Sequence, residues 1–256
     1  MLNNFPIVLT LEYVDAIKRD LAKSLSHVKS SHRVEALARS CGFSTYAALN
    51  AALKEKGAIK VRINWPSFYG YLKSKDFDVA AAPLYKAAGY VAICMSMEKE
   101  RFLTDYGMGI PDAKPKPDGS RETPEERRER FKTKRKLLLL SVEQFLRAYV
   151  FASLVKKIKT IDTRNSSYGL KHLAEKYPCT YPDGQELGPD YVGNGPMIAA
   201  AVHAGFSIEK HYGSPNPSFN MSRKSVRLFR QKIDEYRKNG DESIFDTFKT
   251  NPAKAA

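Results

Sequence analysis

Cysteine is scarce in this sequence, which limits the kinds of site the chain can build. Its 256 residues include three cysteines, Cys41, Cys94 and Cys179. They are odd in number and far apart, and none lies at a CxxC or Cys/His spacing. This usage excludes a disulfide framework and a zinc module. The acidic residues of the 178–195 segment also lack the spacing of a calcium loop, so no metal site is predicted.

Long apolar runs are absent as well. The most apolar stretch, Leu137 to Val155, is interrupted by Ser141, Glu143, Gln144 and Arg147. The first residues lack the basic segment and apolar run of a signal peptide. Neither stretch is predicted to enter a membrane, and we expect a cytoplasmic protein.

The sequence also lacks the common catalytic motifs. It contains no GxxxxGK(S/T) phosphate loop, no HExxH, no GxSxG and no cluster of carboxylates for two metals. No cofactor is predicted. An enzyme acting on nucleic acid is the least supported class, because Tyr168 is the only nucleophile that can be named.

Acidic residues are too few to balance the basic ones. Forty-two Lys and Arg face 28 Asp and Glu, which gives a formal charge of +14. Such a charge attracts polyanions over long range and by counterion release. Nucleic acid is the leading partner, DNA before RNA; an acidic protein partner and a merely solvated basic surface are the alternatives.

The apolar periodicity that is present is mostly helical. Residues 11–28 carry an apolar stripe at steps of three and four, and two further short helices meet at Gly42, the second capped by Ser44. This arrangement resembles a helix-turn-helix, but the second helix offers mainly alanines. Reading of DNA and a purely structural hairpin therefore both remain open. Only residues 58–65 alternate as a strand does.

A long central helix is predicted from 123 to 161. Thr123, Pro124 and Glu126 form a capping box at its start, and its apolar positions between 131 and 152 form a heptad-like seam on which a dimer could be built. We therefore predict a mainly α, multi-helical fold around this helix, with at most one short strand. The expected organisation is an N-terminal helical module (1–106), a Gly- and Pro-rich linker (107–122) and a helical C-terminal domain (123–256).

Three groups of residues are candidates for contact with phosphates. Arginine suits this task because its planar fork donates two parallel hydrogen bonds. One group lies on a helix predicted to start at Ser222, and a second lies in the charged half of the central helix. A third includes Arg164, Tyr168 and His172, whose spacings of four predict one helix face, together with Lys171. The groups are, in that order, Arg223, Lys224, Arg227 and Arg230; Lys134, Arg135 and Lys136; and Arg164, Tyr168, Lys171 and His172.

Several segments resemble proteins of mobile genetic elements. The run SHxxEALARSCGFSTYAAL, followed by FYGYLKSKDFDV and LYKAAGY, is similar to a small helical module at the start of uncharacterised proteins of plasmids, phages and integrative elements. SSYGLKHLAEKY and YVGNGPMIAAAVHAGF are similar to later segments of such proteins. The resemblance covers about half of the chain and carries over no activity and no site residue.

The sequence therefore predicts a nucleic-acid-binding accessory or regulatory protein of a mobile element, which contacts phosphates through basic helices. The alternative is an adaptor or inhibitor that docks its basic surface on an acidic protein.

Overall fold

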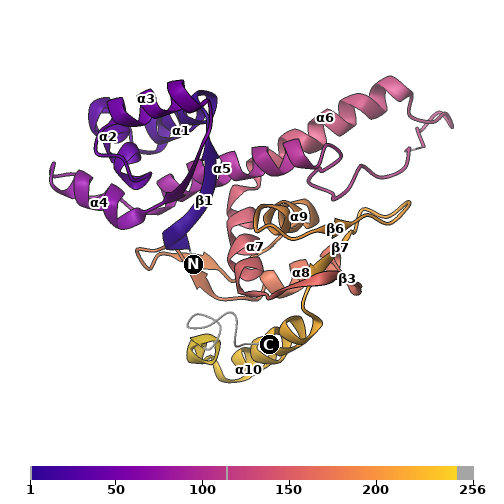
Figure 1. Cartoon of the computed structure of the whole chain (residues 1–256). Coiled ribbons are helices and arrows are strands. Elements are labelled where there is room, and N and C mark those ends of the chain that lie inside the picture. Colours follow the sequence, from indigo (N-terminus) through magenta and orange to yellow (C-terminus); the bar gives the residue numbers. More distant parts are fainter. Residues whose placement is uncertain (1, 114, 247–256) are drawn as a thin grey trace. The chain divides into compact units, whose positions relative to one another are not determined.

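The computed structural model describes residues 2–113 and 115–246 (Figure 1). Over these residues the chain is 56% helix and 14% strand, with seven strands in three sheets. The prediction of a mainly α fold with at most one strand is therefore wrong; the fold mixes α and β. The strands were missed because most are short and lie in Gly- and Pro-rich segments, where periodicity carries little signal.

By its internal contacts the chain divides into two units. Unit 1 comprises residues 1–92 and 180–186, and unit 2 comprises residues 93–179 and 187–256. The division falls inside one helix, α5, and the predicted linker 107–122 lies within unit 2. Unit 2 is the more basic, with 29 Lys and Arg against 19 Asp and Glu, compared with 13 against 9 in unit 1.

Unit 1 contains a two-stranded sheet and helices. Its elements are η1 (Leu2–Asn4), β1 (Phe5–Leu9), α1 (Leu11–Ser24), α2 (Ser30–Ser40), α3 (Tyr46–Lys56), β2 (Ile59–Ile63), α4 (Trp65–Lys73) and the first half of α5 (Ala82–Lys99).

The predicted strand of unit 1 has a partner that the sequence did not reveal. β1 pairs antiparallel with β2, with Phe5 opposite Ile63 and Leu9 opposite Ile59. Alternate residues of β1 are buried, because successive side chains of a strand point to opposite faces. No strand was predicted over the five residues of β1, since so short a run has no distinctive period.

Unit 2 contains the longest helices and the three-stranded sheet. Its elements are the end of α5, α6 (Pro124–Leu140), α7 (Val142–Leu154), β3 (Lys157–Ser166), α8 (Ser167–Ala174), β4 (Cys179–Thr180), β5 (Glu186–Gly188), α9 (Asn194–His203), β6 (Ile208–Glu209), β7 (Ser218–Met221), α10 (Arg223–Asn239) and η2 (Glu242–Phe245). The tip of the β4–β5 hairpin belongs to unit 1. The larger sheet has the order β3-β7-β6, and both of its pairings are antiparallel.

The predicted long central helix is two helices. Its start is confirmed, because Thr123 and Glu126 form the capping box. At Ser141 the axis turns by 68° between α6 and α7. The Ser141 hydroxyl donates to the carbonyl of Leu137 at 3.0 Å, a back-bond that bends helices. The second helix ends at Leu154, and the lysines that were read as its last turn begin β3.

The apolar seam predicted along residues 131–152 lies mostly inside unit 2. Leu138, Phe145 and Ala152 are at most 1% exposed. Tyr149 is buried as well, and its ring packs 5.5 Å from the ring of His203 on α9. These side chains are thus covered by the chain's own core.

No single helix within the described ranges is long and apolar enough to cross a membrane. Only α6 and α7 taken together reach the required length and composition, and they are the sharply bent pair.

Candidate nucleic-acid interface

Helix α10 presents the largest set of unpaired cations. It begins where predicted, because Ser222 Oγ accepts from the N–H of Ser225, and it ends at Gly240 in the left-handed conformation. Val226, Phe229 and Ile233 are buried, and the ring of Phe229 packs 4.9 Å from that of Phe151. This apolar stripe fixes which face of α10 points away from the core.

The outward face of α10 is basic. Six of its cations are exposed and have neither an ion pair nor a side-chain hydrogen bond within the part of the chain that is described. At 100° per residue, five of them lie within one arc of the helix circumference; these are Arg223, Arg227, Arg230, Arg237 and Lys238. Asp234 lies near the centre of this arc, and Lys224 lies at its edge. Lys232, the seventh cation, pairs with Glu235 at 2.8 Å. The six are Arg223, Lys224, Arg227, Arg230, Arg237 and Lys238.

The basic surface continues from α10 onto the start of β3. The N–H of Ser222 donates to the carbonyl of Lys156 at 2.8 Å, and the N–H of Lys156 donates to Ser225 Oγ at 3.3 Å. Lys156 is exposed, and its backbone lies beside the first turn of α10. Sequence reasoning missed this residue because it read the Lys156 to Lys159 segment as the end of a helix rather than a neighbour of α10.

The second predicted group, on α6, has internal partners. Lys134 forms an ion pair with Asp105 at 3.0 Å. The guanidinium of Arg135 donates to the carbonyls of Arg101 at 2.7 Å and Leu103 at 3.1 Å, and burial lowers its pKa. Lys136 alone in this group is exposed and has no ion pair within the described residues.

The structure does not bring the α6 and α10 groups together. Figure 1 shows α6 and α10 on opposite sides of unit 2, with α9 and the β3–β7–β6 sheet between them. One continuous basic surface that includes both groups is therefore excluded.

The third predicted group is divided between a strand and a helix. Arg164 lies on β3 and is exposed, so it does not share a helix face with Tyr168 and His172 as predicted. Tyr168 and His172 do lie one turn apart on α8, with ring centroids 4.8 Å apart. The spacing argument failed at Arg164 because α8 begins only at Ser167.

Lys171 and His172 of α8 both contact Glu175. Lys171 is 6% exposed and pairs with Glu175 Oε1 at 2.9 Å, while His172 Nδ1 lies 2.6 Å from Oε2. Burial alone would raise the pKa of Glu175, but the hydrogen bonds from Lys171 and His172 outweigh it and lower the pKa. The Lys171 ammonium also lies 5.3 Å from the ring of Tyr168 and 5.1 Å from that of Tyr191. Lys171 is thus part of a packed ionic network, and Tyr168 is the exposed one of the three residues of this group on α8.

The helix-turn-helix-like hairpin of unit 1 offers few groups that read bases. Gly42 makes the turn with φ +87°, and the N–H of Phe43 donates to the carbonyl of Ala38. The helix that follows, α3, is capped by Thr45 rather than by Ser44. The positions it exposes on its first turns are alanines, which supports the structural interpretation.

The same helix stop recurs in unit 2. Gly205 has φ +83°, and the N–H of Phe206 donates to the carbonyl of Ala201. Residues 38–44 and 201–207 both read Ala, three residues, Gly, Phe, Ser. Because the strand β6 follows the second copy, the repeat reflects a shared way of ending a helix and not a second helix-turn-helix.

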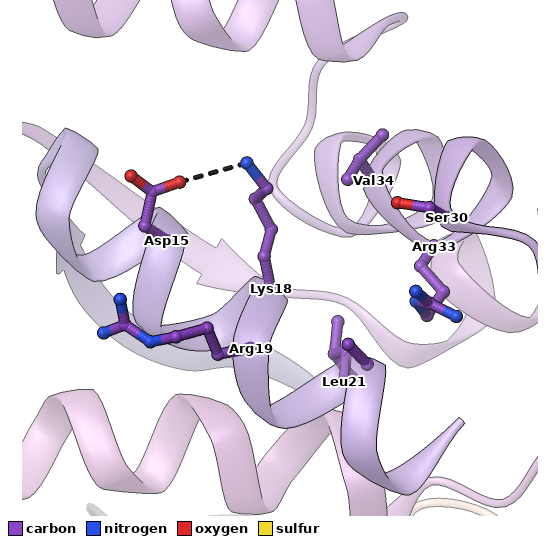
Figure 2. Close-up of a pocket in the computed structure, with 8 residues that line it drawn as sticks. Asp15, Lys18, Arg19, Leu21, Ser30, Arg33 and Val34 are labelled. Carbon is purple, nitrogen blue, oxygen red and sulfur yellow. Dashed lines mark hydrogen bonds and ion pairs between the residues drawn. The ribbon is translucent and has the colours of Figure 1, made fainter. Parts of the chain in front are cut away.

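Unit 1 contains a pocket between α1 and α2, and most of the basic side chains that line it already have partners within unit 1. Figure 2 shows Lys18 directed at Asp15, and this ion pair measures 3.0 Å. Arg33 donates to the backbone carbonyls of Leu25 and Val28, so it closes the turn between the two helices. Arg19 is the remaining cation in the lining. We interpret these contacts as structural.

Comparisons with protein-family models, with curated proteins and with solved structures found no match. Among the described residues there is also no group of three or more His, Cys, Asp or Glu side chains placed to hold a metal ion. The candidate interface therefore depends on geometry and charge alone.

Proposed function

We propose that the protein binds nucleic acid, DNA in preference to RNA, through the phosphates, and that the outward face of α10 with Lys156 is its contact surface. One observation carries this proposal: six exposed cations on one helix have no ion pair within the described residues. A paired cation has a carboxylate beside it that cancels its field and repels phosphate. An unpaired one keeps its full charge for a polyanion.

The resemblance of several segments to proteins of plasmids, phages and integrative elements supports a narrower proposal. The protein acts as an accessory or regulatory factor of a mobile element, and its DNA contacts position it without reading sequence. Phosphate contacts fix register and orientation but carry little sequence information.

The test compares two triple variants of equal charge. Arg223→Ala/Arg227→Ala/Arg230→Ala removes three unpaired cations from α10, and Arg128→Ala/Lys132→Ala/Lys136→Ala removes three exposed cations from α6. Binding to random duplex DNA, duplex RNA and single-stranded DNA is measured by fluorescence anisotropy over a salt series.

The α10 variant should lower the slope of log affinity against log salt by about 2.7 on duplex DNA, since each lost phosphate contact removes about 0.9. The α6 variant should leave the slope within about 0.5 of the unmodified protein. Absence of binding by the unmodified protein at about 50 mM salt would sink the proposal, because phosphate contacts are strong there. If both variants lose the same affinity for duplex DNA and the same salt slope, α10 is rejected as the specific contact surface.

The adaptor alternative predicts a different outcome. A defined protein should then be recovered in a pulldown after nuclease treatment, and the α10 variant should lose that protein while its affinity for DNA is unchanged.

A further inference from the structure

Unit 2 contains a pocket in which aromatic and basic side chains meet. Its volume is about 380 Å³, and three segments far apart in the sequence line it. Residues 102–112 supply Phe102 and Tyr106, residues 210–215 supply Lys210 and His211, and α6 supplies Arg127. We call this the aromatic pocket.

Hydrogen bonds centred on Asn194 hold the walls of the aromatic pocket together. Its side-chain Nδ2 donates to the carbonyl of Tyr106 at 3.0 Å and to that of Pro215 at 3.2 Å. The N–H of Met108 also donates to the carbonyl of Pro215, at 2.9 Å. The two loops are therefore fixed to each other.

Two glycines make this approach of the loops feasible. A Cβ on Gly107 would lie 2.3 Å from Asn194 Nδ2, and a Cβ on Gly195 would lie 1.9 Å from the carbonyl of Thr104. Such distances allow no side chain at either position. The pocket walls are thus set by close backbone packing.

These fixed loops leave large aromatic surfaces in solvent. Phe102 is 65% exposed and Tyr106 is 40% exposed. Tyr212, which stands between two lining residues in the sequence, is fully exposed. Exposed rings on rigid backbone are a suitable platform for a flat partner, because little conformational entropy is lost when the partner stacks.

The charges around the rings favour an anion. Arg127 has no ion pair or side-chain hydrogen bond within the described residues. Lys210 pairs with Glu100 at 2.7 Å, and His211 Nε2 lies 2.9 Å from Ser218 Oγ. Asp112 is the one carboxylate in the lining. A ligand with a flat ring and a phosphate matches both features of the pocket.

We propose that the aromatic pocket binds an unstacked base of single-stranded DNA, with Phe102 and Tyr106 against the base and Arg127 on an adjoining phosphate. In a duplex the faces of the bases are covered by their neighbours, so the pocket selects single strands. This inference rests on the proposed function and adds the form of nucleic acid that is bound.

The test uses Phe102→Ala/Tyr106→Ala, with Tyr191→Ala as the control because Tyr191 is an equally exposed aromatic outside the pocket. Affinities for an oligothymidylate and for a duplex are measured by anisotropy. The pocket variant should bind the single strand roughly tenfold more weakly and the duplex within about twofold of the unmodified protein. The Tyr191 variant should bind both as the unmodified protein does. Arg127→Gln should lower the salt slope on the single strand by about 0.7.

The outcomes separate this inference from the proposed function. If the pocket variant keeps its affinity for single strands while the α10 triple variant loses affinity for duplex, the inference is wrong and the proposed function stands. If the pocket variant loses affinity for single strands and the α10 triple variant keeps its affinity for duplex, the proposed role of α10 is wrong and the inference about the pocket stands. Thymidine monophosphate binding as tightly as the oligothymidylate would overturn the assignment to single strands.

A loss of folding is checked with Phe102→Leu/Tyr106→Leu, which keeps apolar volume but removes the rings. It should unfold at the same temperature as the unmodified protein and show the same weakening for single strands. Undiminished single-strand binding by this variant would also overturn the inference.

Discussion

Helices α6 and α10 have nearly the same composition, but they differ in how many of their cations have an ion-pair partner. Each is 17 residues long and carries seven Lys and Arg, with three Glu on α6 and one Asp and one Glu on α10. On α6, Arg128 pairs with Glu125, Lys132 with Glu129 and Lys134 with Asp105. On α10 only Lys232 has such a partner within the described residues.

The difference shows that two helices with equal numbers of cations can leave different numbers of them without an ion pair. Arg130 of α6 makes two contacts to Glu122, at 2.7 and 2.6 Å, and donates to the carbonyl of Pro111 at 3.0 Å. Arg130, Lys134 and Arg135 of α6 thus hold residues 101–112 and Glu122 in place. The six exposed cations of α10 make no comparable contact within the described residues, which leaves them available to a partner.

The largest expected difference between the two helices is in stability. Arg135→Ala removes the donor to the carbonyls of Arg101 and Leu103 and should lower the free energy of unfolding by about 2 to 3 kcal/mol. Arg230→Ala on α10, which removes no such bond, should change it by less than about 0.5 kcal/mol. Denaturant unfolding monitored by circular dichroism measures both. Equal destabilisation by the two substitutions would contradict the division of roles.

The sequence predicted where both helices begin but not which of their cations have partners. The starts at Thr123 and Ser222 and the buried stripe of α10 are local features, readable from capping residues and a period of 3.6. Arg128 and Lys132 pair with Glu125 and Glu129 of α6 itself. Arg130 and Lys134, however, pair with Glu122 and Asp105, which lie outside the helix. Local sequence carries no signal for such partners.

The short strands and the aromatic pocket could not be predicted from the sequence for the same reason: each depends on contacts between segments far apart in the chain. β1 is stabilised by β2, some fifty residues later, and two-residue strands such as β4 exist only through their pairing. The loop carrying Tyr106 was predicted to begin a linker because it is rich in Gly and Pro. It is fixed instead by Asn194, and Gly107 is needed for that close approach. Exposed aromatics next to glycines were the one signal that pointed to this site.

An intermediate effect is expected when α6 is made to resemble α10. In the α10 triple variant, Glu125→Gln/Glu129→Gln frees Arg128 and Lys132 from their partners and should raise the affinity for duplex DNA roughly three- to tenfold, with about two units regained in the salt slope. Anisotropy at low salt measures this gain.

The control for this gain changes the net charge by the same amount elsewhere. Asp20→Asn/Asp76→Asn neutralises two carboxylates of unit 1 that have no ion pair within the described residues. It should raise the affinity by less than about twofold. A gain equal to that of the α6 substitutions would mean that net charge, rather than local pairing, sets the binding.

The smallest expected effect is a dependence of this gain on pH. The hydrogen bond from Lys132 holds the pKa of Glu129 below its usual range. A carboxylate with a lowered pKa stabilises the fold above its unfolded pKa, and this contribution is lost as pH falls through the folded value. Two proteins are compared: the α10 triple variant, and the same variant with Glu129→Gln added. The difference between their affinities for duplex DNA should persist at about pH 4.3, the usual glutamate pKa, and vanish only below that pH. Both variants contain the same five histidines, so the protonation of these histidines cancels in the affinity difference. Anisotropy in matched buffers measures it, and a difference that vanishes already near pH 5 would show that Lys132 does not hold Glu129 in its ionised form.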